Sequence, residues 1–310
     1  MTNEVFQFIG FDWTHLQSPA LRLLSVEART CQLVPLTGLI FGFQVVDTKR
    51  HCCGWFDLTG VQSEFVPCAK SEIVESGTQC PTCKAREGFL SVHHAHDVRA
   101  LPKNVSNYIG RPHRVYLDVF ADGTVKVGTI AESRLDVRLA EQGAFAANYV
   151  AWTSDGIWAR ELEDALSSNL NLKQSMSGRS KLKALESNLE ASTIHASLDR
   201  ASGLAQTFLR SHYKANDDVK IYDSPKEWLP PECSASAFRS CPAVLYPFAV
   251  TEGEHSFRVV GVTGSILVAH ESEDDGFAQA MAVDLSALRG HRITLGDYAQ
   301  REIKYQATLF

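Results

Sequence analysis

The sequence has no apolar run that approaches the roughly 20 residues needed to span a bilayer. Its longest run, LTGLIFGFQVV, is interrupted by Thr, Gly and Gln and is typical of a buried strand. The first residues, MTNEVFQFIGFDW, lack the basic start and the apolar core of a secretory signal. We therefore expect no membrane partner and a cytoplasmic location, where thiols stay reduced.

The sequence also lacks an excess of positive charge, since 30 Lys and Arg residues face 36 Asp and Glu residues and give a formal net charge of -6. This balance argues against broad, non-specific adhesion to a polyanion. A local basic surface is still compatible with it, because Lys and Arg residues lie on both sides of the central segment. With 310 residues and 45% apolar content, the chain has material for two or three compact units.

Five of the eight cysteines fall within a short stretch, the last two of them as C-P-T-C. A C-x2-C turn presents two thiolates to a tetrahedral cation, and two distant cysteines complete its shell. A redox CxxC or unpaired buried thiols would not account for five cysteines so close together. We therefore predict a structural zinc site with no open position. The preferred ligands are Cys53, Cys68, Cys80 and Cys83, with Cys52 or His51 as alternates.

A second group of metal-ligating residue types follows in VHHAHD. It contains His93, His94, His96 and Asp97, without the i, i+4 spacing of a helical metal motif. A run of loop histidines is usually solvated, so we base no function on this group.

Residues 114–130 alternate as a β-hairpin. Val115, Leu117 and Val119 lie on one face of the first strand, Tyr116, Asp118 and Phe120 on the other, and Asp122-Gly123 supplies a two-residue turn. Tyr116 and Lys126 flank this turn at nearly equal distances, so the two side chains are expected to lie close across the strand pair.

Two helices are predicted after the hairpin. Ser133 is a candidate N-cap and Gly143 a stop for the first, which carries Arg134, Arg138 and Gln142 on one face. Asp155 caps the second, in which Glu163 lies beside the apolar stripe. A carboxylate in that position is often partly buried, which makes it a candidate metal ligand or base. The candidate catalytic residues are Tyr116, Lys126, Arg134, Arg138, Gln142 and Glu163.

The order of these residues resembles the GIY-YIG nuclease superfamily, with RVY in the place of the first signature and KVG in the place of the second. The resemblance implies that Tyr116 and Arg138 position a scissile phosphate and that Glu163 holds one divalent cation, Mg²⁺ or Mn²⁺. Lys126 stands where the family has its second tyrosine. An ammonium at its ordinary pKa, near 10.4, cannot accept a proton from water, so Lys126 would bind phosphate or need desolvation to act as a base.

The whole chain is similar to a bacterial family in which such a core follows a cysteine cluster and precedes a β-rich segment. The phrases that carry this similarity are CCGW, CPTC, VKVG, RLAEQGA, ARELE and GVTGSILV. The similarity implies an α+β fold. GVTG itself precedes no helix, so it indicates a hairpin rather than a phosphate-binding loop.

We predict four regions along the chain. A β-rich zinc-binding region covers residues 1–100, the GIY-YIG-like α/β module 101–178, a helical segment of two helices 179–223, and a second β-rich region 224–310. The Pro-rich SPKEWLPPE at 224–232 is expected to be a connector. The two β-rich regions are small enough to pack together with the module inserted between them.

Three functions remain open. The first is divalent-metal-assisted hydrolysis of a phosphodiester, with nucleic acid or another phosphate-containing substrate as the partner. The second is a non-catalytic nucleic-acid-binding or assembly module, and the third is a small-molecule enzyme of a specialised pathway on the same fold. The sequence does not indicate the oligomeric state.

Overall fold

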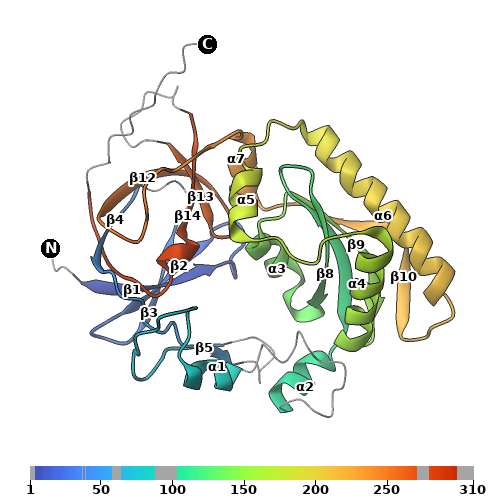
Figure 1. Ribbon diagram of the computed structural model, residues 1–310, viewed down its shortest axis with the longest axis horizontal. Helices are drawn as coiled ribbons and strands as arrows, with labels where there is room; N and C mark the ends of the chain where they lie inside the picture. Colours follow the sequence, from blue (N-terminus) through green and yellow to red (C-terminus); the bar gives the residue numbers. More distant parts are fainter. Residues whose placement is uncertain are drawn as a thin grey trace.

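The computed structural model describes residues 4–36, 38, 40–57, 64–87, 103–270 and 279–298. Its α+β class is as predicted: a nine-stranded sheet lies on one side and a smaller sheet with its helices on the other (Figure 1). No described helix is both long and apolar enough to cross a membrane.

The two ends of the chain share the nine-stranded sheet. Its strand order is β11-β14-β13-β12-β4-β15-β1-β2-β3. β12 pairs with β4, and β15 lies between β4 and β1, so C-terminal strands are interleaved with N-terminal ones. Aromatic side chains such as Phe8, Phe43 and Phe257 fill its core. The strands are β1 (Val5–Asp12), β2 (Ala20–Ser25), β3 (Cys31–Pro35), β4 (Ile40–Asp47), β11 (Val244–Leu245), β12 (Glu254–Thr263), β13 (Ile266–His270), β14 (Met281–Asp284) and β15 (Arg292–Leu295).

The central module is a four-stranded sheet of order β10-β9-β7-β8. One face carries the predicted stripe of Val115, Leu117 and Val119, which packs against helices α4 and α6. The other face carries Tyr116 and Tyr149 and packs towards α3 and the nine-stranded sheet. The elements are β7 (His113–Val119), β8 (Val125–Ala131), α3 (Leu135–Gln142), β9 (Ala146–Thr153), α4 (Gly156–Leu170), α6 (Ala191–Tyr213) and β10 (Val219–Trp228).

The predicted hairpin is confirmed as β7 and β8, with Tyr116 opposite Gly128. Its turn is longer than the two residues predicted, because the backbone N–H of Phe120 donates to Thr124 and encloses three residues between them. Gly123 takes a φ of 77° there, a left-handed conformation that glycine adopts without steric cost.

The predicted helix ends are confirmed in two cases and wrong in one. Gly143 ends α3 at a φ of 72°, and the side chain of Asp155 caps α4 by accepting from the N–H groups of Ile157 and Trp158. Ser133 is not an N-cap, because it lies inside a 3-10 turn, η3 (Glu132–Arg134), which leads directly into α3.

The prediction of a connector at 224–232 was wrong for residues 224–228. Those residues belong to β10, an edge strand of the four-stranded sheet. The register with β9 shifts between Ile221 and Lys226, so Pro225 lies in an irregularity, where a missing backbone donor is tolerated. Trp228 then packs into the main core. The sheet that carries the candidate site therefore extends to residue 228.

The remaining elements connect and cover these two bodies. The two predicted helices between residues 179 and 223 are present as α5 and α6. Five of the eight cysteines lie in or next to a two-stranded ribbon and one short helix, and α2 lies below the module in Figure 1. These elements are β5 (Trp55–Asp57), β6 (Glu64–Val66), α1 (Pro81–Glu87), α2 (Lys103–Ile109), α5 (Gly178–Ala184), α7 (Glu232–Arg239) and η4 (Leu285–Leu288).

Candidate functional site

Four buried cysteine thiols converge beside the β5–β6 ribbon. The ligand atoms of Cys52, Cys68, Cys80 and Cys83 all lie within 4.8 Å of one another. The Sγ atoms of Cys68 and Cys80 are 4.0 Å apart, close to the roughly 3.8 Å that tetrahedral Zn–S bonds of about 2.3 Å would give. The thiols also match the donor type that zinc prefers. This cluster, called the cysteine cluster below, can hold a metal ion such as zinc.

The preference for Cys53 as a ligand was wrong, and the alternate Cys52 takes its place. Neighbouring side chains of an extended segment point to opposite sides, so only one of the two can face the cluster. Cys53 instead packs with Ile9, Leu24 and Phe65 against the nine-stranded sheet.

The thiol pKa values in the cysteine cluster diverge. Burial raises the pKa of Cys52 to about 11 and raises that of Cys83 as well. Burial acts the same way on Cys68, but hydrogen bonds from the backbone of Glu72 and Lys70 outweigh it and lower the pKa to about 7. A bound cation would release the protons of the buried thiols, so this site couples metal binding to proton release.

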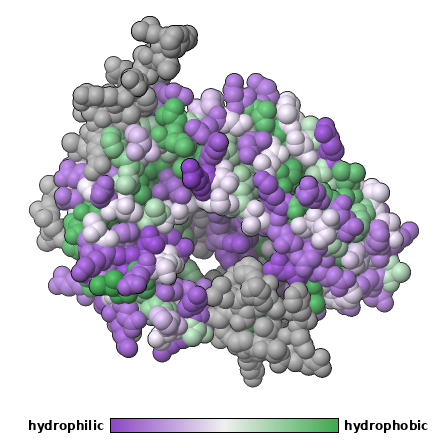
Figure 2. All heavy atoms as spheres, in the orientation of Figure 1, coloured by the Kyte–Doolittle hydropathy of each residue, from purple (hydrophilic) through white to green (hydrophobic). Residues whose placement is uncertain are grey.

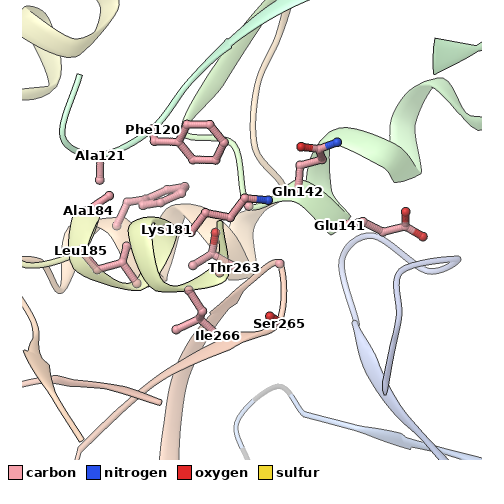
Figure 3. A pocket seen from close by; sticks show the side chains of 14 residues that line it. Phe120, Ala121, Glu141, Gln142, Lys181, Ala184, Leu185, Thr263, Ser265 and Ile266 are labelled. Carbon is pink, nitrogen blue, oxygen red and sulfur yellow. The ribbon is translucent and has the colours of Figure 1, made fainter. Parts of the chain in front are cut away.

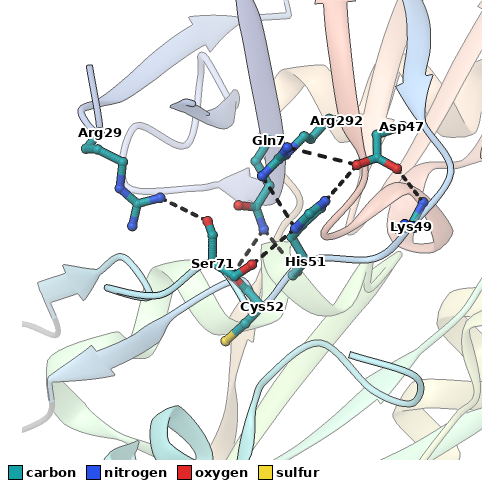
Figure 4. A network of polar contacts seen from close by, with 8 residues as sticks. All are labelled: Gln7, Arg29, Asp47, Lys49, His51, Cys52, Ser71 and Arg292. Carbon is teal, nitrogen blue, oxygen red and sulfur yellow. Dashed lines mark hydrogen bonds and ion pairs between the residues drawn. The ribbon is translucent and has the colours of Figure 1, made fainter. Parts of the chain in front are cut away.

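His51, the other alternate ligand, belongs to a different network (Figure 4). Its Nε2 lies 2.9 Å from an oxygen of Asp47 and its Nδ1 lies 3.2 Å from the carbonyl of Ser71. The side-chain amide of Gln7 donates to the carbonyls of His51 and Cys52, at 3.0 and 3.1 Å. His51 and Gln7 therefore tie the backbone of a cluster cysteine to the nine-stranded sheet.

The predicted proximity of Tyr116 and Lys126 is confirmed, and both are buried. The ammonium of Lys126 donates to the Tyr116 hydroxyl at 3.3 Å and lies 3.4 Å from a carboxylate oxygen of Asp118. The amide of Gln142, at the end of α3, reaches the same hydroxyl at 3.4 Å. An added Cβ at Gly128 would lie 2.5 Å from the Tyr116 ring, so glycine is required for the ring to lie over β8.

Lys126 is charged in the folded protein. Burial lowers its pKa, but Asp118 and Tyr116 outweigh burial, and the pKa ends above its ordinary value. Burial alone raises the pKa of Asp118 and would favour its neutral form. We assign an ion pair, because the ammonium and a carboxylate oxygen lie 3.4 Å apart and both groups are buried. Lys126 is therefore not a general base.

Glu163 is buried on α4, as predicted, and only 5% of it is exposed. Its carboxylate is 2.7 Å from the guanidinium of Arg160. Burial raises its pKa to about 7, although Arg160, Lys126 and Arg138 all act in the opposite direction. A divalent cation here would displace Arg160 and face two further cations. Among the described residues, Glu163 also joins no group of three possible ligands. This carboxylate therefore does not fit Mg²⁺ or Mn²⁺ as it stands.

Arg134 and Arg138 bracket one carboxylate, that of Glu141. Arg134 approaches both of its oxygens at 2.7 Å, and Arg138 lies 3.7 Å from one of them. All three residues line a cleft of about 540 Å³ between α3 and the first strands of the nine-stranded sheet. Figure 2 shows a hollow near the centre of this face with hydrophilic side chains on its wall. Of the residues that the structure describes, five arginines line the cleft, Arg22, Arg111, Arg134, Arg138 and Arg289, against three carboxylates, Asp12, Glu87 and Glu141.

A small recess of about 30 Å³ lies on the other side of Glu141 and shares Gly264 and Ser265 with the cleft. Lys181 extends into it from α5, opposite Thr263 (Figure 3). Burial lowers the pKa of Lys181 to about 8, with Lys126 contributing in the same direction. The recess has room for water rather than for a substrate.

The structure thus divides the six predicted catalytic residues into two groups. Tyr116, Lys126, Gln142 and Glu163 lie in or beside a buried polar group, whereas Arg134 and Arg138 face the cleft. The charge of Arg138 acts to lower the pKa values of Tyr116, Lys126 and Glu163. Arg138 therefore belongs to both groups.

Sequence reasoning missed Asp118, Glu141 and Lys181 as site residues. The sequence did indicate a role for Asp118. A carboxylate on the same strand face as Tyr116 requires a compensating polar or charged group when that face is buried. Glu141 follows Arg134 by seven residues and Arg138 by three, which also places it on their side of α3. His93, His94, His96 and Asp97 lie outside the described residues.

Residues 44–272 match the protein family that is described as "Protein of unknown function (DUF2797)". No curated protein and no solved structure matches the chain. The matched range contains the cysteine cluster, the whole four-stranded sheet and most of the C-terminal strands. Because it covers more than half of the sequence, the chain belongs to the DUF2797 family.

Proposed function

We propose that this protein binds a phosphate-bearing substrate, namely a phosphodiester of nucleic acid or a related compound, in the arginine-lined cleft. The observation that carries the proposal is the charge of the cleft wall, where five arginines face three carboxylates although the whole chain is acidic. Guanidinium groups bind phosphate oxygens in pairs and hold their charge at every physiological pH. A volume of about 540 Å³ lies within the range of small-ligand sites.

Arg138 is the residue best placed to receive the phosphate. Its side chain is 40% exposed, and its contact with Glu141 is long, at 3.7 Å. Arg134 holds Glu141 from the other side with two short contacts, so that carboxylate remains compensated when Arg138 turns to a ligand. Arg138 also joins the cleft to the buried polar group.

Replacing Arg138 by Ala is expected to weaken binding of a labelled single-stranded oligonucleotide about tenfold, because one charge-assisted contact of roughly 1.4 kcal/mol is lost. Fluorescence anisotropy at fixed salt measures this change. Arg200→Ala is the control, because it removes an equal charge from an exposed position on α6, outside the cleft. Equal losses in the two variants would contradict a specific phosphate site and indicate general charge attraction.

A second candidate function is hydrolysis of the bound phosphodiester, for which the pKa of Glu163 and the GIY-YIG resemblance are the support. A carboxylate with a pKa of about 7 is suited to accept a proton near neutral pH. In this proposal the attacking water gives its proton to Glu163 as its oxygen bonds to phosphorus. Arg138 neutralises the phosphoryl oxygens, and the leaving oxygen takes a proton as its bond to phosphorus breaks. Tyr116 is a neutral phenol, since burial raises its pKa, and it can supply that proton.

Glu163→Gln is expected to abolish cleavage while leaving oligonucleotide binding in place. Wild-type cleavage should rise with pH through about 7, because the carboxylate must be deprotonated. The assay contains single-stranded and duplex RNA and DNA, with and without added Mg²⁺ or Mn²⁺. If no substrate is cleaved by the folded wild-type protein, the binding function stands without catalysis, or the cleft takes a small molecule.

Unfolding measurements provide a test of Glu163 that is independent of activity. The pKa of Glu163 in the folded protein, about 7, lies above its ordinary value of 4.5, so the group's stability contribution is complete below about pH 4.5 and is lost as pH rises through 7. As pH rises from 4.5 to above 7, the free energy of unfolding of Glu163→Gln should increase by roughly 3 kcal/mol relative to that of wild type. A pH-independent difference would contradict the shifted pKa.

The cysteine cluster completes the proposal as a structural zinc site. All four positions of a tetrahedral shell are filled by thiols, which leaves none open for water or substrate. Thiolate ligands require a reducing compartment, so the proposal keeps the cytoplasm as the location.

A further inference from the structure

The wall of the cleft that faces α3 is built partly from the region of the cysteine cluster. Phe56 of β5 and Glu87 of α1 line the cleft, and both elements adjoin cluster cysteines. Two further half-buried rings, Phe11 and Tyr108, also line it. The cleft therefore combines aromatic surface with guanidinium groups, and phosphate binding alone does not require the aromatic surface.

Phe56 is held in place from several sides. Its backbone N–H donates to the Glu87 carboxylate at 3.1 Å. Its ring packs edge to face against Phe65, with ring centres 5.5 Å apart. The guanidinium of Arg22 lies over both rings, at 5.8 Å from Phe56 and 5.4 Å from Phe65, and forms an ion pair with Asp12. Because the ring is fixed before any ligand arrives, stacking of a flat ligand on it costs the protein little conformational entropy.

A ligand that satisfies both surfaces carries a flat aromatic group and a phosphate. We infer that the cleft binds a nucleotide unit, with its base stacked on Phe56 and its phosphate at Arg138. This inference rests on the proposed phosphate site and names its substrate class. Stacking of a base on an aromatic side chain tolerates any base, because every base presents a π-face. A free nucleotide and one nucleotide of a single strand share this chemistry.

The cysteine cluster then shapes ligand affinity without touching the ligand. Cys83 and Glu87 lie one helical turn apart on α1, and Glu87 holds the backbone of Phe56. Gln79, which precedes Cys80, donates to both Gly54 and Glu87. The position of the stacking ring is therefore set by residues next to the cluster cysteines.

The experiment compares ribose 5-phosphate, AMP and a single-stranded oligonucleotide as ligands in calorimetric titrations. AMP should bind wild type about tenfold more tightly than ribose 5-phosphate, because only AMP can stack. Phe56→Leu should remove this preference and leave ribose 5-phosphate binding unchanged. Phe56→Tyr should retain it. Phe208→Leu is the matched control, because it removes a half-buried ring on α6, outside the cleft and away from Phe56.

The outcomes distinguish failure of the base site from failure of the phosphate site. Equal affinities of wild type for AMP and ribose 5-phosphate would overturn the base site and leave the phosphate site intact, even if Phe56→Leu does not fold. No binding of any ligand would overturn the proposed function itself. An equal loss in Phe56→Leu and Phe208→Leu would also overturn the base site. An oligonucleotide that binds more tightly than AMP identifies the strand as the source of the nucleotide, and equal affinity identifies the free compound.

Discussion

Replacing Cys52 by Ser is expected to abolish metal binding and unfold the segment around α1. Zinc bound by four thiolates supplies apparent free energies of about 10–16 kcal/mol in small domains, where binding and folding are one process. Here α1 has only seven residues and one buried side chain, that of Cys83, so it has little other stabilisation. Native mass spectrometry should find one zinc per wild-type chain and none in the variant. Hydrogen exchange should show loss of protection in Pro81–Glu87.

Cys53→Ser is the matched control for this experiment. Cys53 is the next residue, is equally buried and lies outside the cysteine cluster, so the variant should keep its zinc. If Cys53→Ser loses the metal and Cys52→Ser keeps it, the assignment of the four ligands is wrong. If both variants keep the metal, the cluster is not a zinc site.

The cysteine cluster shows what spacing can and cannot predict. C-P-T-C predicted two members of the cluster correctly, because two residues between cysteines let one turn present both thiols. The choice between Cys52 and Cys53 depends on which face of an extended segment is turned towards α1. That orientation is set by contacts distant in sequence, among them the hydrogen bond from Gln7 to the Cys52 carbonyl. No local pattern contains this information.

In the module, local signals predicted β7, β8, α3 and α4 but missed two strands of the sheet, β9 and β10. Alternation predicted β7 and β8, and Asp155 and Gly143 predicted helix ends, because these effects act within a few residues. β10 was mistaken for a connector since Pro225 suppresses a strand prediction. An edge strand accepts proline at an irregularity, but edge position is a property of the assembled sheet.

The candidate site was predictable where a residue's role follows from its own strand or helix. Glu163 was expected to be buried because it lies beside an apolar stripe, and it is. The separation of Arg134 and Arg138 from Tyr116 was not predictable, because it depends on how α3 lies between the cleft and the four-stranded sheet.

Replacing Asp118 by Asn is expected to destabilise the protein by about 3–5 kcal/mol, because Lys126 would remain buried and charged without its partner. Among the described residues the carboxylate oxygens of Asp118 have no hydrogen-bond partner, so the stabilisation within this pair depends on the charge of the ammonium 3.4 Å away. Lys126→Met should cost a similar amount, because it leaves the fully buried carboxylate uncompensated. Urea unfolding at pH 7 measures both losses, with the exposed Asp122→Asn in the same hairpin as a control of little effect.

The double variant Asp118→Leu with Lys126→Met distinguishes an ion pair from two independent contributions. Replacing both charges by apolar groups of similar volume removes the attraction together with the cost of burying the charges. We expect this double variant to recover most of the stability that either single substitution loses. If its loss instead equals the sum of the losses of Asp118→Leu and Lys126→Met measured separately, the two groups are not coupled in the folded protein, and Lys126 then takes its charge compensation from elsewhere. Recovery of stability with loss of substrate binding would assign the pair to the site rather than to the fold, because apolar residues would then suffice for folding alone.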